Sequence, residues 1–282
     1  MRKQTVLLTG ANGQLGKAMQ ATSPDRWDIV PFTSSDLDIR DWRAVRDAYA
    51  RVKPDLVVHA AAATNVDRCE REPDWAYSVN ALGTRHIAKA AALVGAALVY
   101  VSTNYVFNGN KSSPYHEFDL TDPISVYGAS KLAGEFEAVR ASNRYWIART
   151  ASVYAEHGTN FVATMRRLME ELPRITVVDD QYSNPTYAAD LASAIVQIVE
   201  HAPFGTYHVT NAGTASWHEW ASEIQRLTGA QCDVAPIPAS EYTRDAQPPA
   251  NGTMISLALD GYGIEIPDWR DALQRCVDRW PA

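Results

Sequence analysis

The chain has 282 residues, of which 46% are hydrophobic and 21% are charged, and its formal net charge is -7. This composition is that of a soluble globular protein with enough residues to bury a sizeable core. The negative charge argues against nucleic acid or an acidic membrane as a partner, while it leaves room for a local basic pocket that binds a phosphorylated metabolite.

Three cysteines, Cys69, Cys232 and Cys276, lie far apart and in no metal-ligand spacing. This pattern disfavours a disulfide framework and a zinc site, so we expect reduced thiols and no bound metal. The apolar run near the N-terminus, at residues 6–8, is too short for a signal peptide or a membrane span. We therefore expect a cytoplasmic protein without a membrane partner.

The first half of the chain alternates short apolar runs with longer helical patterns. The strands expected in chain order are residues 6–8, 29–32, 56–59, 97–102 and 146–150. The helices expected between them are residues 15–21, 42–50, 75–94 and 126–139. Strands and helices that alternate in this way indicate βαβ units with right-handed crossovers and a parallel sheet buried on both faces. We therefore predict an α/β protein with a Rossmann-like, doubly wound parallel sheet.

The chain after residue 150 has a different pattern. We expect helices at residues 160–172 and 188–200, and strands at residues 175–178 and 206–210. Ser216 and Glu219 have the spacing of a capping box at the start of a further helix, and a proline-rich stretch follows. We interpret residues 1–150 as one domain, and residues 151–282 as sheet completion mixed with a small C-terminal substrate lobe.

Three glycines, Gly10, Gly13 and Gly16, follow the first expected strand and open the first expected helix. Glycines at such a junction permit a tight turn and close approach of the backbone to a pyrophosphate, and the helix N-terminus supplies unpaired N–H groups. The spacing alone is weak evidence, and a cluster of turn glycines is the plain alternative. The strand before and the helix after favour a dinucleotide cofactor.

The end of the second expected strand bears on the choice between NAD and NADP. An acid there would bind the ribose 2'-hydroxyl of NAD. The chain instead has Thr33, Ser34 and Ser35, with no acid until Asp36 and no arginine until Arg40. Hydroxyl groups can contact a 2'-phosphate without repelling it, so we predict NADPH as the cofactor with NADH tolerated.

Tyr127 and Lys131 lie four residues apart in the expected helix at residues 126–139. That spacing puts both side chains on one helix face, where we expect the ammonium group to lower the pKa of the phenol. A tyrosine with its ordinary pKa of about 10 is a poor proton shuttle at neutral pH. The alternative is an exposed pair on a solvated helix, because Tyr-x-x-x-Lys is frequent by chance.

With these features in place, the chain resembles the extended short-chain dehydrogenases/reductases and, more closely, the dTDP-4-dehydrorhamnose reductase family. The matching motifs are at residues 10–16, 37–39, 59–70, 80–84, 102–109, 127–135, 180–191, 251 and 268–269. The resemblance implies an oxidoreductase of dTDP-rhamnose or related deoxysugar biosynthesis. It would use NAD(P)H to reduce the C4 keto group of a nucleotide-linked 4-keto-6-deoxyhexose.

The resemblance also assigns roles to residues. Thr103 would be the catalytic hydroxyl, Tyr127 the proton donor, and Lys131 both the modifier of its pKa and a ligand of the nicotinamide ribose. The cofactor-binding residues would be Gly10, Gly13, Gln14, Leu15, Gly16, Asp38, Ile39, Ala62, Ala63, Thr64, Tyr127 and Lys131. Thr103, Asn104 and Ser152 would contact the substrate. The plain alternative for Thr103 is a strand-end residue without a role.

The chain departs from the family pattern mainly on the sugar-facing side. Asn104 replaces the usual Asp, Ser152 replaces a Trp that lies beside the sugar, and Ser183 and Gly252 also differ from the usual residues. Loss of a large aromatic side chain predicts a roomier and more polar pocket. The resemblance therefore leaves the nucleotide, the sugar and the product stereochemistry open.

Two other functions remain open, a nucleotide-sugar epimerase and a non-catalytic regulatory or binding subunit with the same fold. A dehydratase is disfavoured, because Asn104 and Tyr105 lack the acids that the elimination needs. A homodimer is open, but Ala18 stands where some relatives have an acid that links two subunits through a divalent cation.

Several cationic side chains are candidates for phosphate binding by their location alone. Arg149, Arg166, Arg167 and Arg244 could meet substrate phosphates, but such residues are more often structural or at the surface. His59, in an apolar run, is more often a packed core residue than a catalyst.

Overall fold

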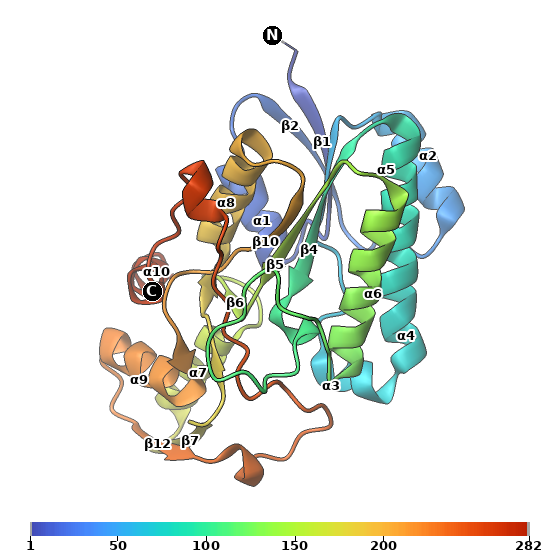
Figure 1. The fold of residues 1–282 in the computed structure, drawn as a ribbon. Helices are drawn as coiled ribbons and strands as arrows, with labels where there is room; N and C mark the ends of the chain where they lie inside the picture. Colours follow the sequence, from blue (N-terminus) through green and yellow to red (C-terminus); the bar gives the residue numbers. More distant parts are fainter. Residues whose placement is uncertain (1, 281–282) are drawn as a thin grey trace.

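The computed structural model describes residues 2–280. Its centre is a parallel sheet of six strands in the order β10-β5-β4-β3-β1-β2 (Figure 1). These strands are β1 (Gln4–Thr9), β2 (Trp27–Phe32), β3 (Leu56–His59), β4 (Ala97–Thr103), β5 (Tyr145–Thr150) and β10 (Gly205–His208). The prediction of a Rossmann-like α/β fold is confirmed.

Helices cover both faces of this sheet (Figure 1). The helices that pack on it are α1 (Gln14–Thr22) and α8 (Ala188–His201) on one face, and α2 (Trp42–Val52), α5 (Thr84–Val94) and α6 (Val126–Ala141) on the other. Successive strand residues serve opposite faces, since Leu8 belongs to the core under α1 and α8 while Leu7 belongs to the core under α2 and α5. Burial on both faces explains why the strands appear in the sequence as continuous apolar runs.

The helix expected at residues 75–94 is three segments. They are α4 (Pro73–Tyr77), the π-helical turn η1 (Ser78–Gly83) and α5. Within η1 the buried Asn80 amide binds both backbone groups of Ala63, accepting from its N–H at 2.8 Å and donating to its carbonyl at 3.2 Å. The π-helical turn thus carries a contact between helix and loop that hydrophobic periodicity does not reveal.

Short elements that the sequence did not predict stand near the sheet edge. Helix α3 (Val66–Arg71) precedes α4, and the 3-10 turn η2 (Asn104–Val106) follows β4 directly. Both lie next to α6, so they help to place the residues at the start of that helix.

The C-terminal half contributes to two structures. Strand β10 and helix α8 belong to the central sheet and its cover, whereas α7 (Phe161–Glu171), α9 (Trp217–Thr228) and α10 (Trp269–Asp278) build a lobe with its own core. That core includes Trp220 and Trp269, each at most 2% exposed. The division at residue 150 stays an interpretation, because both halves of the chain share one sheet.

Small strands complete the lobe. These are β6 (Val153–Tyr154) with β9 (Thr186–Tyr187), β7 (Arg174–Val178) with β12 (Asp233–Ile237), and β8 (Tyr182–Ser183) with β11 (Ala215–Ser216). The remaining turns are η3 (Ala239–Glu241) and η4 (Leu259–Tyr262). The capping box predicted at Ser216 is confirmed, since Ser216 and Glu219 each accept the other's backbone N–H.

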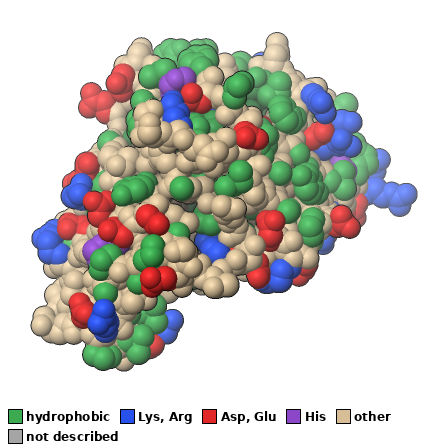
Figure 2. Space-filling view, turned by 60° about the horizontal axis from the view of Figure 1, so that its bottom comes forward, with side chains coloured by type: hydrophobic (Ala, Val, Ile, Leu, Met, Phe, Trp, Pro, Cys, Tyr) green, Lys and Arg blue, Asp and Glu red, His purple; other side chains and the backbone are tan. Residues whose placement is uncertain are grey.

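Two broader properties complete the description. Within residues 2–280, no helix is long and apolar enough to cross a bilayer. On the face shown in Figure 2, acidic and basic side chains are interspersed, and neither sign forms a continuous field.

Candidate active site

A cavity of about 920 Å³ opens along the C-terminal edge of the central sheet. Thr9, Thr103 and Thr150, the last residues of β1, β4 and β5, all line it. Ligands of open α/β sheets bind at this edge, where the loops that follow the strands meet. The volume lies near the upper end of the range for small-molecule sites.

The cavity brings together every residue that the sequence placed in the site. The predicted residues that line it are Gly10, Gly13, Gln14, Leu15, Gly16, Asp38, Ile39, Ala62, Ala63, Thr64, Thr103, Asn104, Tyr127, Lys131 and Ser152. Their convergence from six separate segments supports one common site. The role of each residue stays a prediction.

The glycine loop is packed so tightly that side chains are excluded. Gly10 has a φ of +72°, and a Cβ there would lie 2.7 Å from the backbone nitrogen of Ala61. A Cβ on Gly16 would lie 2.2 Å from the carbonyl oxygen of Gly10. Helix α1 begins at Gln14, and its N-cap residue Gly13 has no side chain to cap it, so the first N–H groups of the helix stay available beside the cavity. This arrangement suits a phosphate group.

The loop after β2 places hydroxyl groups and one guanidinium along the cavity. Asp36 is turned back onto its own loop, where it accepts from the Thr33 N–H at 2.9 Å and the Thr33 hydroxyl at 2.6 Å. The hydrogen bonds from Thr33 lower the pKa of Asp36. The Arg40 guanidinium donates three hydrogen bonds to the Asp38 carboxylate, at 2.9, 3.2 and 2.7 Å, and both residues line the cavity with Ser34.

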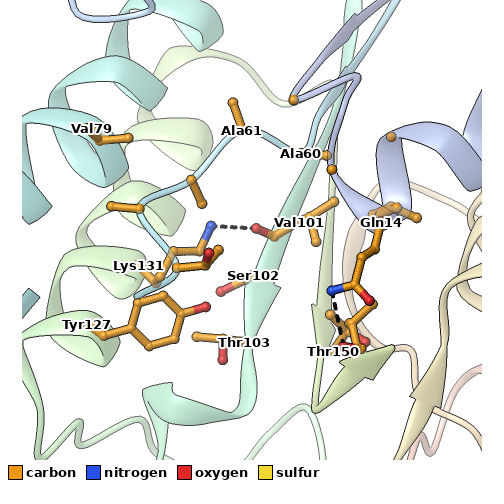
Figure 3. A pocket seen from close by; sticks show the side chains of 18 of the residues that line it. Gln14, Ala60, Ala61, Val79, Val101, Ser102, Thr103, Tyr127, Lys131 and Thr150 are labelled. Atoms are coloured by element: carbon orange, nitrogen blue, oxygen red, sulfur yellow. Dashed lines mark hydrogen bonds between the residues drawn. The ribbon is translucent and has the colours of Figure 1, made fainter. Parts of the chain in front are cut away.

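Tyr127 and Lys131 project from the first turns of α6 toward β4, opposite Gln14 of α1 (Figure 3). Ser125 starts the helix by accepting the N–H of Gly128 at 3.2 Å. A Cβ on Gly128 would lie 2.1 Å from the Tyr105 carbonyl oxygen, so α6 packs directly on η2. The Lys131 ammonium donates to the Val101 carbonyl at 2.6 Å (Figure 3).

The expectation that Lys131 lowers the pKa of Tyr127 is wrong for this arrangement. Burial raises the pKa of Tyr127 well above its ordinary value, and the hydrogen bond with Thr103 opposes that rise only in part. The Lys131 ammonium is bound to a carbonyl of β4, and burial lowers its own pKa to about 7 while Glu135 acts in the opposite direction. Tyr127 is therefore protonated at neutral pH, as a proton donor must be.

Beneath Lys131 lies a buried ion pair. Glu135 accepts two hydrogen bonds from Arg149, at 2.9 and 2.7 Å, and one from the Ser102 hydroxyl at 2.5 Å. Both members of the pair are at most 7% exposed. Arg149 is accordingly a structural residue, and its guanidinium already has a carboxylate partner.

The other cationic candidates also have structural partners. Arg166 and Arg167 pair with Glu170 and Glu171 one helical turn further along α7, and Arg244 pairs with Asp67. His59 is fully buried, with Thr9 at 2.7 Å and Thr84 at 3.2 Å from its ring nitrogens. Burial lowers the pKa of His59 to about 3, so this residue is neutral and part of the core.

The sugar-facing wall carries a hydroxyl pair. Ser152 has a φ of +46°, and its hydroxyl lies 2.7 Å from that of Ser183. Both residues line the cavity together with Tyr182, Trp217 and Pro249. The wall is polar at this point, as the sequence predicted for Ser152.

The sequence did not reveal the segment that closes over the glycine loop. His157, Gly158, Thr159 and Asn160 line the cavity there. The Asn160 amide caps α7 and donates to the side-chain oxygen of Gln14 at 3.1 Å. The signal for a helix start at Asn160 was present, but no pattern links it to a residue 146 positions away.

The chain is similar to known proteins over nearly its whole length. The family model of the RmlD substrate binding domain matches residues 4–281. The chain is 39% identical over 271 residues to the spore coat polysaccharide biosynthesis protein SpsK of Bacillus subtilis, with 95% of each chain covered. It is 37% identical to the dTDP-4-dehydrorhamnose reductase of Burkholderia thailandensis, with 96% of this chain and 97% of the other covered.

A solved structure shows the same similarity in three dimensions. The dTDP-4-dehydrorhamnose reductase of Bacillus anthracis, in complex with NADP, superimposes with a TM-score of 0.95 at 42% identity. The match covers 97% of this chain and 98% of that one. Family match, sequence identity and superposition agree over nearly the whole length, and the chain therefore belongs to the dTDP-4-dehydrorhamnose reductase family.

Proposed function

We propose that the protein is an NADPH-dependent oxidoreductase that reduces the C4 keto group of a nucleotide-linked 4-keto-6-deoxyhexose in dTDP-rhamnose or related deoxysugar biosynthesis. The observation that carries this proposal is the convergence of Thr103, Tyr127 and Lys131 in a cavity that continues to the glycine loop. The names of the relatives, and the NADP bound by one of them, support the same chemistry.

The residues along one half of the cavity fit the cofactor. The free N–H groups at the start of α1, by Gly13 and Gln14, would hold the pyrophosphate. Thr33 and Arg40 would receive a 2'-phosphate, since a guanidinium and a hydroxyl both bind phosphate oxygens. Bound there, NADPH supplies the hydride that reduces the C4 carbonyl carbon.

Tyr127 and its neighbours would handle the proton. The protonated phenol of Tyr127, which is partly buried, gives its proton to the alkoxide that develops at O4. The Lys131 ammonium, one helical turn away, would donate to the nicotinamide ribose, as the family resemblance implies. Thr103 donates a hydrogen bond to the same substrate oxygen, in a site where burial strengthens such contacts.

The function is tested by following NADPH oxidation with dTDP-4-dehydrorhamnose and related 4-keto sugars. We expect Tyr127→Phe to lower kcat by roughly 10²- to 10⁴-fold, the usual contribution of a positioned general acid, while NADPH still binds. Tyr242→Phe, at an exposed tyrosine outside the cavity, is the matched control. Wild-type turnover by Tyr127→Phe would show that Tyr127 is not the proton donor.

The same assay separates the alternatives. An epimerase would change the sugar without net consumption of NADPH, and a regulatory subunit would do neither. A homodimer and a cytoplasmic location stay predictions of the sequence.

A further inference from the structure

Asn104 follows the proposed catalytic Thr103 and is 3% exposed at the cavity wall. Its amide nitrogen donates to the Gly252 carbonyl oxygen at 2.9 Å. Because a carbonyl oxygen can only accept, this contact fixes which end of the amide carries the nitrogen. The amide oxygen therefore faces Thr103, whose hydroxyl donates to it at 3.3 Å.

Gly252 has no conformational reason to be glycine. Its φ lies outside the left-handed range that favours this residue. A Cβ at position 252 would lie 2.4 Å from the Asn104 amide nitrogen, whereas its next neighbours, in Pro249 and Tyr182, would be at 3.4 and 3.5 Å. Among the residues described, the Asn104 amide is thus the one group that would clash with a Cβ at position 252.

The contact joins two walls of the cavity. Residues 249–254 come from the C-terminal half, and Pro249 lines the cavity on the side of Tyr182. The loop after η2 holds this segment through the Tyr115 N–H, which donates to the Thr253 carbonyl at 2.8 Å, and through Gly109, where a Cβ would lie 2.6 Å from the Ala250 nitrogen. Those contacts are remote from the chemistry, whereas the contact of Asn104 with Gly252 reaches Thr103 itself.

We propose that Asn104 is a positioning residue, whose amide fixes the Thr103 hydroxyl relative to the wall formed by residues 249–254, and that any side chain at 252 would have to displace this amide. The uncharged amide oxygen accepts a hydrogen bond from the Thr103 hydroxyl, and this bond is weaker than one to a carboxylate. The hydroxyl can then turn its proton to a substrate oxygen while its own oxygen keeps the Tyr105 N–H at 3.2 Å. The inference rests on the proposed function, which gives Thr103 its role.

A double-mutant cycle tests the coupling, with Asn104→Ala, Gly252→Ala and the double variant. We expect Gly252→Ala to lower kcat roughly tenfold, because a misplacement of about 1 Å can cost roughly a hundredfold and the shift expected here is smaller. The KM for NADPH should not change. In the Asn104→Ala background the same change should cost less than about twofold, since the space that the new methyl group needs is free. Gly261→Ala, where a Cβ meets nothing within 4 Å, is the matched control.

An equal loss of kcat in both backgrounds, or wild-type kcat for Gly252→Ala, would overturn the proposal. Urea unfolding of the same four proteins gives a second readout. Coupling seen in the unfolding midpoints but not in kcat would make the contact structural only, which also overturns the positioning role. If the wild-type protein reduces no 4-keto sugar, the proposed function fails, and coupled midpoints would still support the exclusion of a side chain at 252.

A second variant is available if Gly252→Ala does not fold. Asn104→Asp keeps the side-chain volume and removes only the donor, so a carboxylate would face the Gly252 carbonyl oxygen. We expect a similar loss of kcat with an unchanged KM for NADPH. Wild-type kcat in this variant would contradict the proposal.

Discussion

The two halves of the cavity are built differently. The cofactor half is a backbone surface, in which Gly10 and Gly16 touch neighbouring main-chain atoms so closely that only glycine fits. The sugar half is made of side-chain contacts between distant segments, such as Ser152 with Ser183 and Asn104 with Gly252. A backbone surface tolerates few substitutions, whereas paired side chains can change together. We therefore expect few substitutions to be tolerated in the cofactor half. Substitutions in the sugar half are the ones that can give a family member another substrate.

The largest effect is expected at the glycine loop. Gly16→Ala would force a Cβ against the Gly10 carbonyl oxygen at 2.2 Å and the Ala11 Cα at 2.7 Å, both of them backbone atoms. Overpacking of this kind costs about 1–3 kcal/mol of folding free energy. Because a loop that moves to relieve this clash would also leave the position that receives the pyrophosphate, we expect NADPH affinity, measured by calorimetry, to fall roughly a hundredfold, which is about 2.8 kcal/mol of binding free energy. An unchanged affinity would show that the loop can yield, and the contrast between the halves would then be lost.

The pH dependence of kcat/KM for NADPH is the next largest effect. Burial lowers the pKa of Lys131 to about 7, so its ammonium is charged below this pH and neutral above it. Tyr127 stays protonated over the same range, because its pKa is raised. Since kcat/KM reports the free enzyme, we expect it to fall about tenfold per pH unit above pH ~7.

Lys131→Arg provides the control for this assignment. A guanidinium stays charged over the whole range, so the alkaline fall should move to higher pH even if the rate at neutral pH is lower. A profile that is level between about pH 7 and 9 in the wild-type protein would exclude Lys131 as the titrating group.

Arg40 should strengthen the binding of NADPH much more than the binding of NADH. Arg40 lines the cavity, as Thr33 does, but its guanidinium is half exposed and shared with Asp38, so screening limits its contribution. We expect Arg40→Ala to weaken NADPH binding by roughly tenfold and NADH binding by less than about twofold, because only NADPH has the 2'-phosphate. Arg43→Ala, at an exposed position outside the cavity, is the control. Equal losses for both cofactors would place the 2'-phosphate elsewhere.

What the sequence could predict follows the same division. Local patterns gave the strands closely, and the strand at residues 56–59 has those bounds in the structure. They also gave the glycine loop and the spacing of Tyr127 and Lys131. They could not give the π-helical turn, because the contact of Asn80 with Ala63 depends on the folded chain. The prediction of a lowered pKa for Tyr127 was wrong for a similar reason. Burial by other segments of the folded chain raises this pKa, and the spacing of residues on one helix does not reveal that burial.

The smallest effect on kinetics is expected at the sugar-facing wall. It should change the KM for the sugar and leave the KM for NADPH as it is. Ser152→Trp would place a large ring beside Ser183 and break their hydroxyl pair, which leaves less room and fewer polar partners for a sugar hydroxyl. We expect the KM for the preferred 4-keto sugar to rise several-fold, since one lost hydrogen bond is worth about 0.5–1.5 kcal/mol. The KM for NADPH should not change.

The variant should also change the preference among sugars. If Ser152 is what adapts the wall, kcat/KM for dTDP-4-dehydrorhamnose should rise relative to kcat/KM for sugars with another substituent. A parallel change in the KM of every sugar and of NADPH would instead mean that the ring disturbs the whole cavity, and the two halves would not be independent.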